Sequence, residues 1–122
     1  MKIPTYLTFI LISLGTTLAY ASGDANNGQK LYSSRCIACH SIDVSMAGPS
    51  HRGVYGRKAG SVNDFEYSQA LKKSNVTWND KTLNKWLTNP EKLIPGQKMG
   101  FSVSDKNERN DLIAYLKEQI IQ

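Results

Sequence analysis

The sequence predicts an all-α protein with a single domain. The chain has 122 residues, which is enough for one ordinary domain. Hydrophobic residues make up 40% of it and charged residues 20%, a balance typical of a compact domain and not of a disordered chain. Several segments have apolar residues at helical spacing, strand patterns are weak everywhere, and no internal repeat is visible.

The first predicted helix covers residues 25–35. Leu31 and Tyr32 lie on its apolar side, and Gly28 offers a surface that another helix can approach closely. The last helix is predicted to begin after Ser104-Asp105. Its apolar stripe consists of Leu112, Ile113, Leu116 and Ile120, with Tyr115 beside it. That stripe needs a partner, so we expect the two terminal helices to cross at Gly28.

The capping signals of the last helix and of a middle helix support these limits. Asp105 and Glu108 stand at the spacing of a capping box, although Asp is a less usual cap there than Ser or Thr. A middle helix is predicted over residues 80–88, with Asn79 as its cap and with Leu83, Trp86 and Leu87 facing inward. Asn89-Pro90 should end it. A further short helix over residues 68–73 gives a total of three to five helices.

The N-terminal segment is predicted to be a secretory signal peptide. Lys2 is followed by an uncharged, mostly apolar stretch over residues 5–18, and Ala19-Tyr20-Ala21 has the pattern that signal peptidase recognises. Residues 1–21 would then be removed after Ala21, leaving residues 22–122 as one domain with a net charge of +4 in place of +5. The simplest location is a bacterial periplasm. The alternative is an uncleaved membrane anchor, for which the apolar run is short.

Two cysteines and a histidine form the most informative motif, Cys36-Ile37-Ala38-Cys39-His40. Cys-x-x-Cys-His is the pattern of covalent c-type haem attachment. Thiols three positions apart lie on one side of a helical turn, within reach of both vinyl groups of a haem. The adjacent His40 can then direct its imidazole toward the iron. We therefore predict one haem c, bound covalently through Cys36 and Cys39, with His40 as an iron ligand.

Three other interpretations of this motif agree less well with the sequence. A thioredoxin-like dithiol follows a strand, and no strand is predicted before Cys36. A structural zinc site needs four ligands, whereas His51 is the only other histidine and there is no third cysteine. A simple disulfide leaves His40 without a role.

The second iron ligand is predicted to be Met99. It follows Pro95-Gly96-Gln97-Lys98, a loop whose proline and glycine can hold a side chain in a fixed place. Ligation by His and Met raises the reduction potential of a haem. Met46 lies only six residues after His40, too close to reach the opposite face of the haem. His51 is a rival ligand, although we expect it to point outward, and Met99 as an ordinary core residue is the remaining alternative.

Further short motifs follow the haem motif along residues 23–117. They are, in chain order, Gly48-Pro49, Gly53-Val54-Tyr55-Gly56-Arg57-Lys58, Phe65-Glu66-Tyr67, Thr77-Trp78, Asn89-Pro90, Ile94-Pro95-Gly96 with Lys98-Met99, and Asp111-Leu112-Ile113-Ala114-Tyr115-Leu116. In order and spacing the chain resembles the class I cytochromes c, in particular the mitochondrial-like branch found in bacteria. The resemblance implies the cytochrome c fold, in which helices wrap around one haem.

The resemblance also implies roles for single residues. The Pro49 carbonyl would accept the ring N–H of His40 and so fix its tautomer. Trp86 would lie beside Met99, where the family more often has Tyr, and Phe101 would lie at the exposed haem edge. The residues expected at the haem propionates, where buried carboxylates need donors, are Arg57, Tyr67 and Trp78.

The positive charge is predicted to steer redox partners. A secreted chain without a run of like charges does not favour a nucleic-acid ligand. The cations expected around the haem edge are Lys30, Arg35, Lys92, Lys98 and Lys106. Glu91 and Met46 occupy positions where mitochondrial relatives carry Lys, so the positive face should be weaker than theirs. Steering by this face should decrease with added salt.

The predicted function is that of an electron carrier, not an enzyme. A soluble, monomeric periplasmic protein would move one electron at a time on its haem. The resemblance implies a quinol-oxidising complex or a dehydrogenase as donor, and a terminal oxidase, peroxidase or photosynthetic centre as acceptor. The alternatives are a haem enzyme such as a peroxidase, or a gas or redox sensor. Both need a sixth coordination position on the iron that is open or exchangeable. Binding of carbon monoxide to the reduced protein would reveal such a position.

Overall fold

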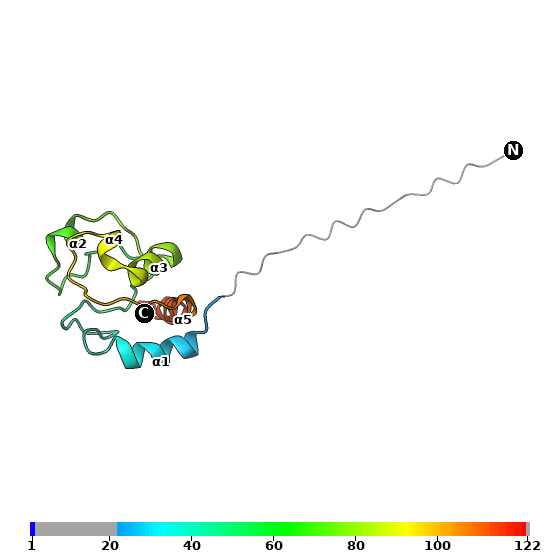
Figure 1. Ribbon diagram of the computed structural model, residues 1–122, viewed down its shortest axis with the longest axis horizontal. Coiled ribbons are helices and arrows are strands. Elements are labelled where there is room, and N and C mark those ends of the chain that lie inside the picture. The colour runs from blue at the N-terminus through cyan, green and yellow to red at the C-terminus, as the bar shows by residue number, and fades with distance from the viewer. Residues whose placement is uncertain (2–21, 122) are drawn as a thin grey trace.

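Five helices joined by long loops make up the part of the chain that the structure describes. The structure is a computed structural model that describes residue 1 and residues 22–121. The helices are α1 (Ala25–Arg35), α2 (Gln69–Lys73), α3 (Asp80–Thr88), α4 (Pro90–Leu93) and α5 (Lys106–Glu118) (Figure 1). Within these residues the only β-pairing is one antiparallel bridge between Lys58 and Thr77. The predicted all-α class is confirmed. The predicted signal peptide, apart from Met1, lies outside the described residues.

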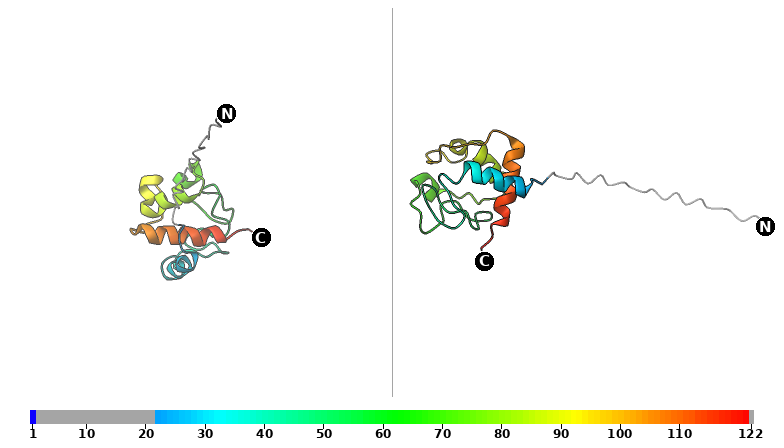
Figure 2. Two further views of the ribbon diagram at one scale, coloured as in Figure 1. Left: turned by 90° about the vertical axis from the view of Figure 1, so that its right-hand side faces the viewer. Right: turned by 90° about the horizontal axis from the view of Figure 1, so that it is seen from below.

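The two terminal helices cross, as the sequence predicts (Figure 2). Gly28 is buried at the crossing, and a Cβ at this position would stand 2.0 Å from the backbone oxygen of Asp111. Only glycine permits this approach. The Asp111 carboxylate also accepts hydrogen bonds from the backbone N–H of Asp24 and from the side-chain amide of Asn27, each at 2.7 Å. The start of α1 is thereby fixed against the middle of α5.

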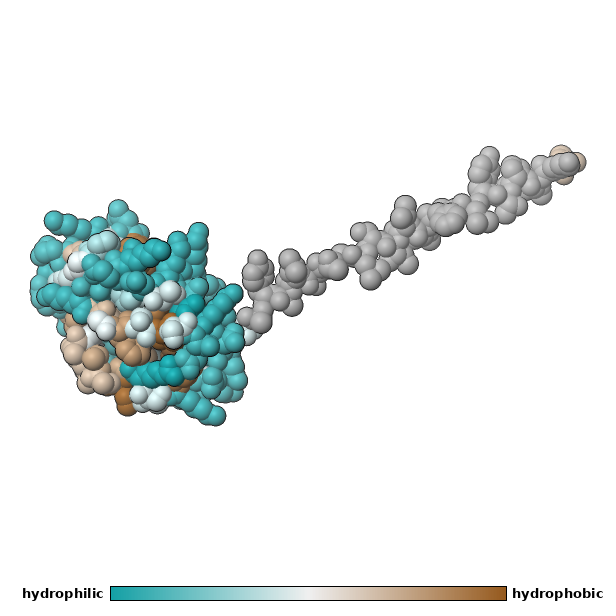
Figure 3. Space-filling model, in the orientation of Figure 1, coloured by the Kyte–Doolittle hydropathy of each residue, from teal (hydrophilic) through white to brown (hydrophobic). Residues whose placement is uncertain are grey.

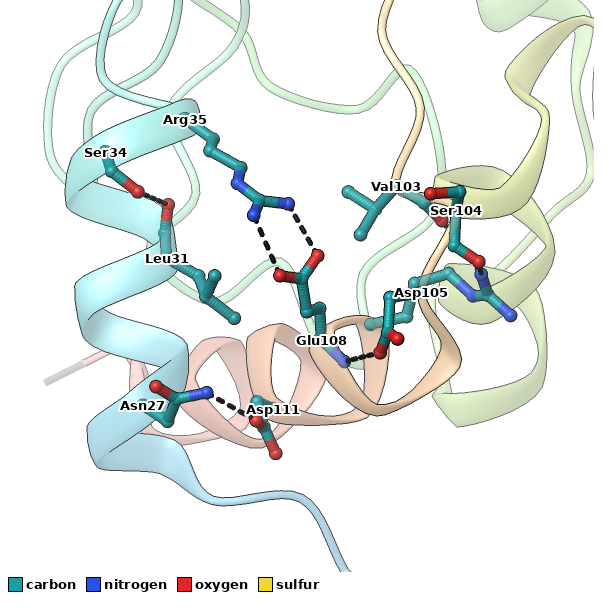
Figure 4. A network of polar contacts seen from close by, with 10 residues as sticks. Asn27, Leu31, Ser34, Arg35, Val103, Ser104, Asp105, Glu108 and Asp111 are labelled. Atoms are coloured by element: carbon teal, nitrogen blue, oxygen red, sulfur yellow. Dashed lines mark hydrogen bonds and ion pairs between the residues drawn. The ribbon is translucent and has the colours of Figure 1, made fainter.

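An ion pair joins the other end of α1 to the first turn of α5. The guanidinium of Arg35 donates two hydrogen bonds to the Glu108 carboxylate, at 2.6 and 2.8 Å (Figure 4). Asp105 caps α5 as predicted, because its carboxylate accepts from the backbone N–H of Glu108 at 2.9 Å. The Glu108 side chain is directed to Arg35, so it contributes to the packing of two helices.

The middle helices begin at strong side-chain caps. α3 has the predicted limits and a reciprocal capping box between Asn79 and Thr82. The predicted stop at Asn89-Pro90 does end α3, but a new short helix, α4, begins there. Pro90 occupies the first turn of α4, where its missing N–H costs nothing, and the Asn89 side chain accepts from the backbone N–H of Lys92 at 3.0 Å. One residue therefore ends one helix and caps the next.

The core lies where α1, α3 and α5 meet the loops. Its buried apolar residues are Tyr32, Val54, Ala59, Tyr67, Leu71, Trp78, Leu83, Leu87, Ile94, Val103, Leu112, Ile113 and Leu116. The prediction that Ile120 belongs to the buried stripe is wrong. α5 ends at Glu118, and the side chain of Ile120 remains 65% exposed.

One buried charge was not predicted. Arg109 on α5 donates to the Asn84 side chain on α3 at 2.6 Å and to the carbonyl oxygens of Val103 and Ser104 at 2.8 and 2.7 Å. A buried charge is tolerated when hydrogen bonds to its donors replace those to water, as they do here at Nε and at one terminal nitrogen. Arg109 thus connects α3, α5 and the loop that precedes α5.

Most of the surface seen in Figure 3 is hydrophilic, with a smaller hydrophobic area on the same face. Among the described residues, no helix has both the length and the apolar character needed to span a membrane.

The helix crossing leads to a stability prediction. The variant Gly28→Ala places a methyl group against the Asp111 carbonyl, so the two helices must separate. We expect the free energy of unfolding of the holoprotein to fall by roughly 1–3 kcal/mol, the usual cost of overpacking. Ser33→Ala, at an exposed position of α1, is the control and should change it by less than about 0.5 kcal/mol. If urea unfolding gave the same loss of unfolding free energy for both variants, the close contact at Gly28 would be contradicted.

Candidate haem site

The haem motif lies on a turn that directly continues α1. The backbone N–H of Cys36 donates to the Tyr32 carbonyl at 2.9 Å, and the N–H groups of Cys39 and His40 both donate to the Cys36 carbonyl, at 3.1 and 2.9 Å. This turn holds the two thiols and the imidazole in a fixed relation to α1. No disulfide joins the two cysteines; Cys36 is half-buried and Cys39 is exposed.

His40 has the hydrogen bond predicted for it. Its Nδ1 lies 2.8 Å from the Pro49 carbonyl oxygen. A carbonyl can only accept, so Nδ1 carries the proton and the lone pair of Nε2 is left for a metal. Burial lowers the pKa of His40, which favours the neutral imidazole that metal binding needs.

Gly48 gives the His40 ring its space. A Cβ at Gly48 would stand 2.2 Å from Cε1 of His40 and 2.7 Å from its Nε2. The backbone N–H of Gly48 donates to the Cys39 carbonyl at 2.8 Å, so the loop returns directly to the haem motif. The glycine is required here by close approach, since its backbone lies against the predicted iron ligand.

Arg57 supplies a test of whether the site fits a haem. Its two terminal nitrogens donate to the carbonyl oxygens of Arg52 and Ser50, at 3.2 and 3.0 Å. Its Nε is buried and is the single buried side-chain polar atom without a partner among the described residues. Such an atom calls for an acceptor that the protein itself does not supply. A haem propionate is an acceptor of the right charge.

Two further predicted donors lie close to Arg57. The backbone N–H of Trp78 donates to the Arg57 carbonyl at 2.9 Å, and the Trp78 side chain is buried. The Tyr67 hydroxyl accepts from the Val62 N–H at 3.2 Å, which leaves its proton free to donate. Burial raises the pKa of Tyr67, so this hydroxyl stays protonated. The donor set therefore fits a haem carboxylate.

Met99 lies in the loop between α4 and α5, as expected. The loop turns at Gly96, which has a φ of +89°. The N–H of Gly96 donates to the Glu91 carboxylate at 2.9 Å, and the N–H of Met99 donates to the Gln97 side chain. Val103 ends the loop by donating to the Leu87 carbonyl at 2.7 Å. The Met99 side chain is half-buried.

The two other predicted aromatic residues differ in their surroundings. Trp86 is half-buried and its ring centroid lies 5.3 Å from that of Trp78, so these two predicted residues share one cluster. Phe101 is 41% exposed, in agreement with a position at an accessible edge. Met46, the methionine judged too close to His40, is also exposed.

The expectation that His51 points outward is wrong. Its ring is stacked on the ring of His40, with centroids 4.1 Å apart and planes at 23°. Its Nδ1 lies 3.0 Å from the Tyr32 hydroxyl, and its backbone N–H donates to the Ser41 carbonyl at 3.0 Å. Burial, with smaller effects from His40 and Arg57, lowers the pKa of His51 to about 3, so the ring is neutral.

The stacking also bears on the choice of iron ligands. Two rings that lie face to face cannot bind one iron from opposite sides, so this geometry does not suit His51 as a ligand opposite His40. The sequence held a signal that position 51 is turned inward, because the family that the chain resembles usually has an apolar residue there.

Comparison with known proteins agrees with this geometry. The Cytochrome c family model matches residues 25–119. The chain belongs to the cytochrome c family. Over 102 residues it is 45% identical to cytochrome c of Gibberella zeae, covering 80% of this chain and 96% of that protein. Over 98 residues it is 47% identical to cytochrome c of Euglena viridis, covering 78% and 96%.

A solved structure gives the same result. Cytochrome cH from Methylobacterium extorquens is 44% identical, covers 79% of this chain and 99% of its own, and superposes with a TM-score of 0.75. The predicted cytochrome c fold and the resemblance to class I cytochromes c are thus confirmed. As a member of this family, the chain is a haem-based electron carrier and not an enzyme, and it holds haem c covalently through Cys36 and Cys39.

The contact between Gly48 and His40 can be tested directly. Gly48→Ala places a methyl group 2.2 Å from Cε1 of His40, so the imidazole must move away. We expect a loss of roughly 1–3 kcal/mol in unfolding free energy and a change in the haem absorption spectrum. Ala47→Ser, at the exposed neighbouring residue, should leave both unchanged. A wild-type spectrum in Gly48→Ala would show that the ring does not depend on this glycine.

Proposed function

We propose that this cytochrome c is an exported one-electron carrier whose axial ligands are His40 and Met99. The observation that carries the proposal is the hydrogen bond from His40 Nδ1 to Pro49, which leaves Nε2 free for the iron. Bound haem c supplies the reversible Fe(III)/Fe(II) step, and a thioether ligand favours the reduced state. Met99 is a suitable donor because a short glycine turn and two anchored N–H groups hold its loop.

The chain's own residues would keep the carrier rigid. The unpaired Nε of Arg57 and the free proton of Tyr67 would be satisfied by the propionates. Trp78 and Trp86 would pack at the haem without rearranging, and Phe101 would cover part of an accessible edge. Such pre-formed contacts keep the reorganisation between oxidation states small.

Export to the periplasm is the location that the sequence supports. The segment over residues 1–21 has the charged start, apolar middle and small-residue end of a signal peptide. Cleavage after Ala21 predicts that the purified protein begins at Ser22. Mass spectrometry of the intact holoprotein tests this, and a chain that retains residues 1–21 would indicate a membrane-tethered carrier.

The partners we propose are redox proteins with an acidic docking surface. The side chains of Lys30, Lys92, Lys98 and Lys106 are exposed. Arg35, the fifth predicted cation, is compensated by Glu108, so its contribution to the positive field is reduced. This favours weak, short-lived, salt-sensitive contacts with a donor such as a quinol-oxidising complex or dehydrogenase. The acceptor would be a terminal oxidase, peroxidase or photosynthetic centre.

Substitution of the methionine ligand tests the proposed function. The wild-type holoprotein should titrate as a single one-electron step at a positive potential. Met99→Leu removes the thioether and should lower the midpoint by more than roughly 100 mV, within the ~0.8 V range that axial ligands set. It should also allow carbon monoxide to bind the reduced protein.

Met46→Leu is the matched control, because Met46 is exposed and should not bind iron. Its potential and its resistance to carbon monoxide should equal those of the wild type. A low wild-type potential, or carbon monoxide binding without any substitution, would instead favour an enzyme or a sensor with an exchangeable ligand.

A further inference from the structure

We propose that His51 is a positioning residue that sets the orientation of the His40 imidazole, and that Tyr32 holds His51 in place. The inference rests on the proposed function only in taking His40 as an iron ligand. It is carried by one chain of contacts: the Tyr32 hydroxyl lies 3.0 Å from His51 Nδ1, and the His51 ring is stacked 4.1 Å from the His40 ring.

The hydrogen bond to Pro49 leaves one degree of freedom in His40. The hydrogen bond at Nδ1 fixes the tautomer of the imidazole. By itself it does not fix the plane of the ring, which can still tilt about the Nδ1–O direction. Gly48 lies against the Cε1 edge of the ring, and His51 covers one of its faces at an interplanar angle of 23°. Rotation of the imidazole would break the stacking, so His51 restricts the plane of the ligand.

His51 can do this because contacts of both its backbone and its ring hold it in position. Its N–H donates to the Ser41 carbonyl at 3.0 Å, and its carbonyl accepts from the Val54 N–H at 2.9 Å. Its ring meets the Tyr32 ring edge-on, with centroids 5.7 Å apart. Tyr32 is only 4% exposed and belongs to α1, the helix that leads into the haem motif.

A purely space-filling role does not account for this pair. Two polar groups placed in a core are costly unless they are hydrogen-bonded to each other, and an aliphatic side chain would fill the same space without that requirement. A hydrogen-bonded imidazole has a defined ring plane, which an aliphatic residue lacks. This is the property that positioning the neighbouring ligand requires.

The test uses the holoproteins of His51→Leu, Tyr32→Phe and the double variant. The proton NMR shifts of the haem methyl groups in the oxidised state report the orientation of the axial imidazole, and potentiometry reports its electronic effect. We expect both single variants to change the spread of the methyl shifts. In the double variant the change should equal that of His51→Leu alone, because Tyr32 acts through His51.

The midpoint potential should shift upward in His51→Leu, since the more positively charged oxidised haem loses a polar neighbour. Tyr115→Phe is the matched control. The ring centroids of Tyr115 and Tyr32 are 5.3 Å apart. Among the described residues, the hydroxyl of Tyr115 makes no hydrogen bond to His51, unlike that of Tyr32. This variant should keep the wild-type methyl shifts and potential.

Stability measured by urea unfolding separates positioning from packing. Lower stability with unchanged methyl shifts and potential in His51→Leu would overturn the proposal. If His51→Leu does not yield holoprotein, Tyr32→Phe decides the question, because it keeps the ring and removes only the hydroxyl; unchanged methyl shifts in it would equally overturn the proposal. A failure of His40/Met99 ligation would be visible in the wild type itself, through carbon monoxide binding before any substitution, and so is distinguishable.

Discussion

The contact between α1 and α5 at Gly28 is the constraint on which the rest of the structure depends. Because a glycine meets a backbone carbonyl there, the distance between the two helix axes leaves no room for any side chain. The last residues of α1 run without interruption into the turn that carries Cys36, Cys39 and His40. The location of the haem motif is therefore set by helix packing, and the Arg35–Glu108 pair fixes the end of α1 closest to it.

The loops around the haem motif are arranged as a shell of nearly satisfied polar groups. The guanidinium of Arg109 donates three hydrogen bonds, to α3 and to the loop before α5, whereas Arg57 retains one buried, unpaired N–H. An unpaired buried donor costs about 1–3 kcal/mol, so the shell is most stable with an acceptor present. A cofactor that supplies this acceptor would contribute to the fold as well as to the function.

Local signals allowed α1 and α3 to be predicted from sequence with their observed limits. Asn79 caps α3 as predicted, and Asp24, which was not predicted as a cap, does the same for α1. Both accept from N–H groups two or three positions away, so the information lies within one helical turn. The burial of Arg109 and the inward orientation of His51 depend on partners far along the chain, whereas Ile120 is exposed because α5 ends before it. Asn84 is 25 residues from Arg109, and Tyr32 is 19 residues from His51. No pattern of spacing reveals such partners, although the haem motif and the loop of Met99 could be recognised from their residues alone.

The C-terminal residues pack against the loop at Arg52 and Gly53, and this has a consequence for the order in which the chain folds. The N–H of Gly53 donates to the Gln119 carbonyl, and the Arg52 side chain reaches the Ile120 carbonyl at 3.4 Å. The backbone N–H of Asp24 donates to the carboxylate of Asp111, 87 residues away. In a chain made from its N-terminus, Cys36 and Cys39 precede the residues of α5 by about 70 positions. Such distant contacts close late. Late closure therefore restricts access mainly to Cys36, which is half-buried in the folded chain, whereas Cys39 is exposed there as well.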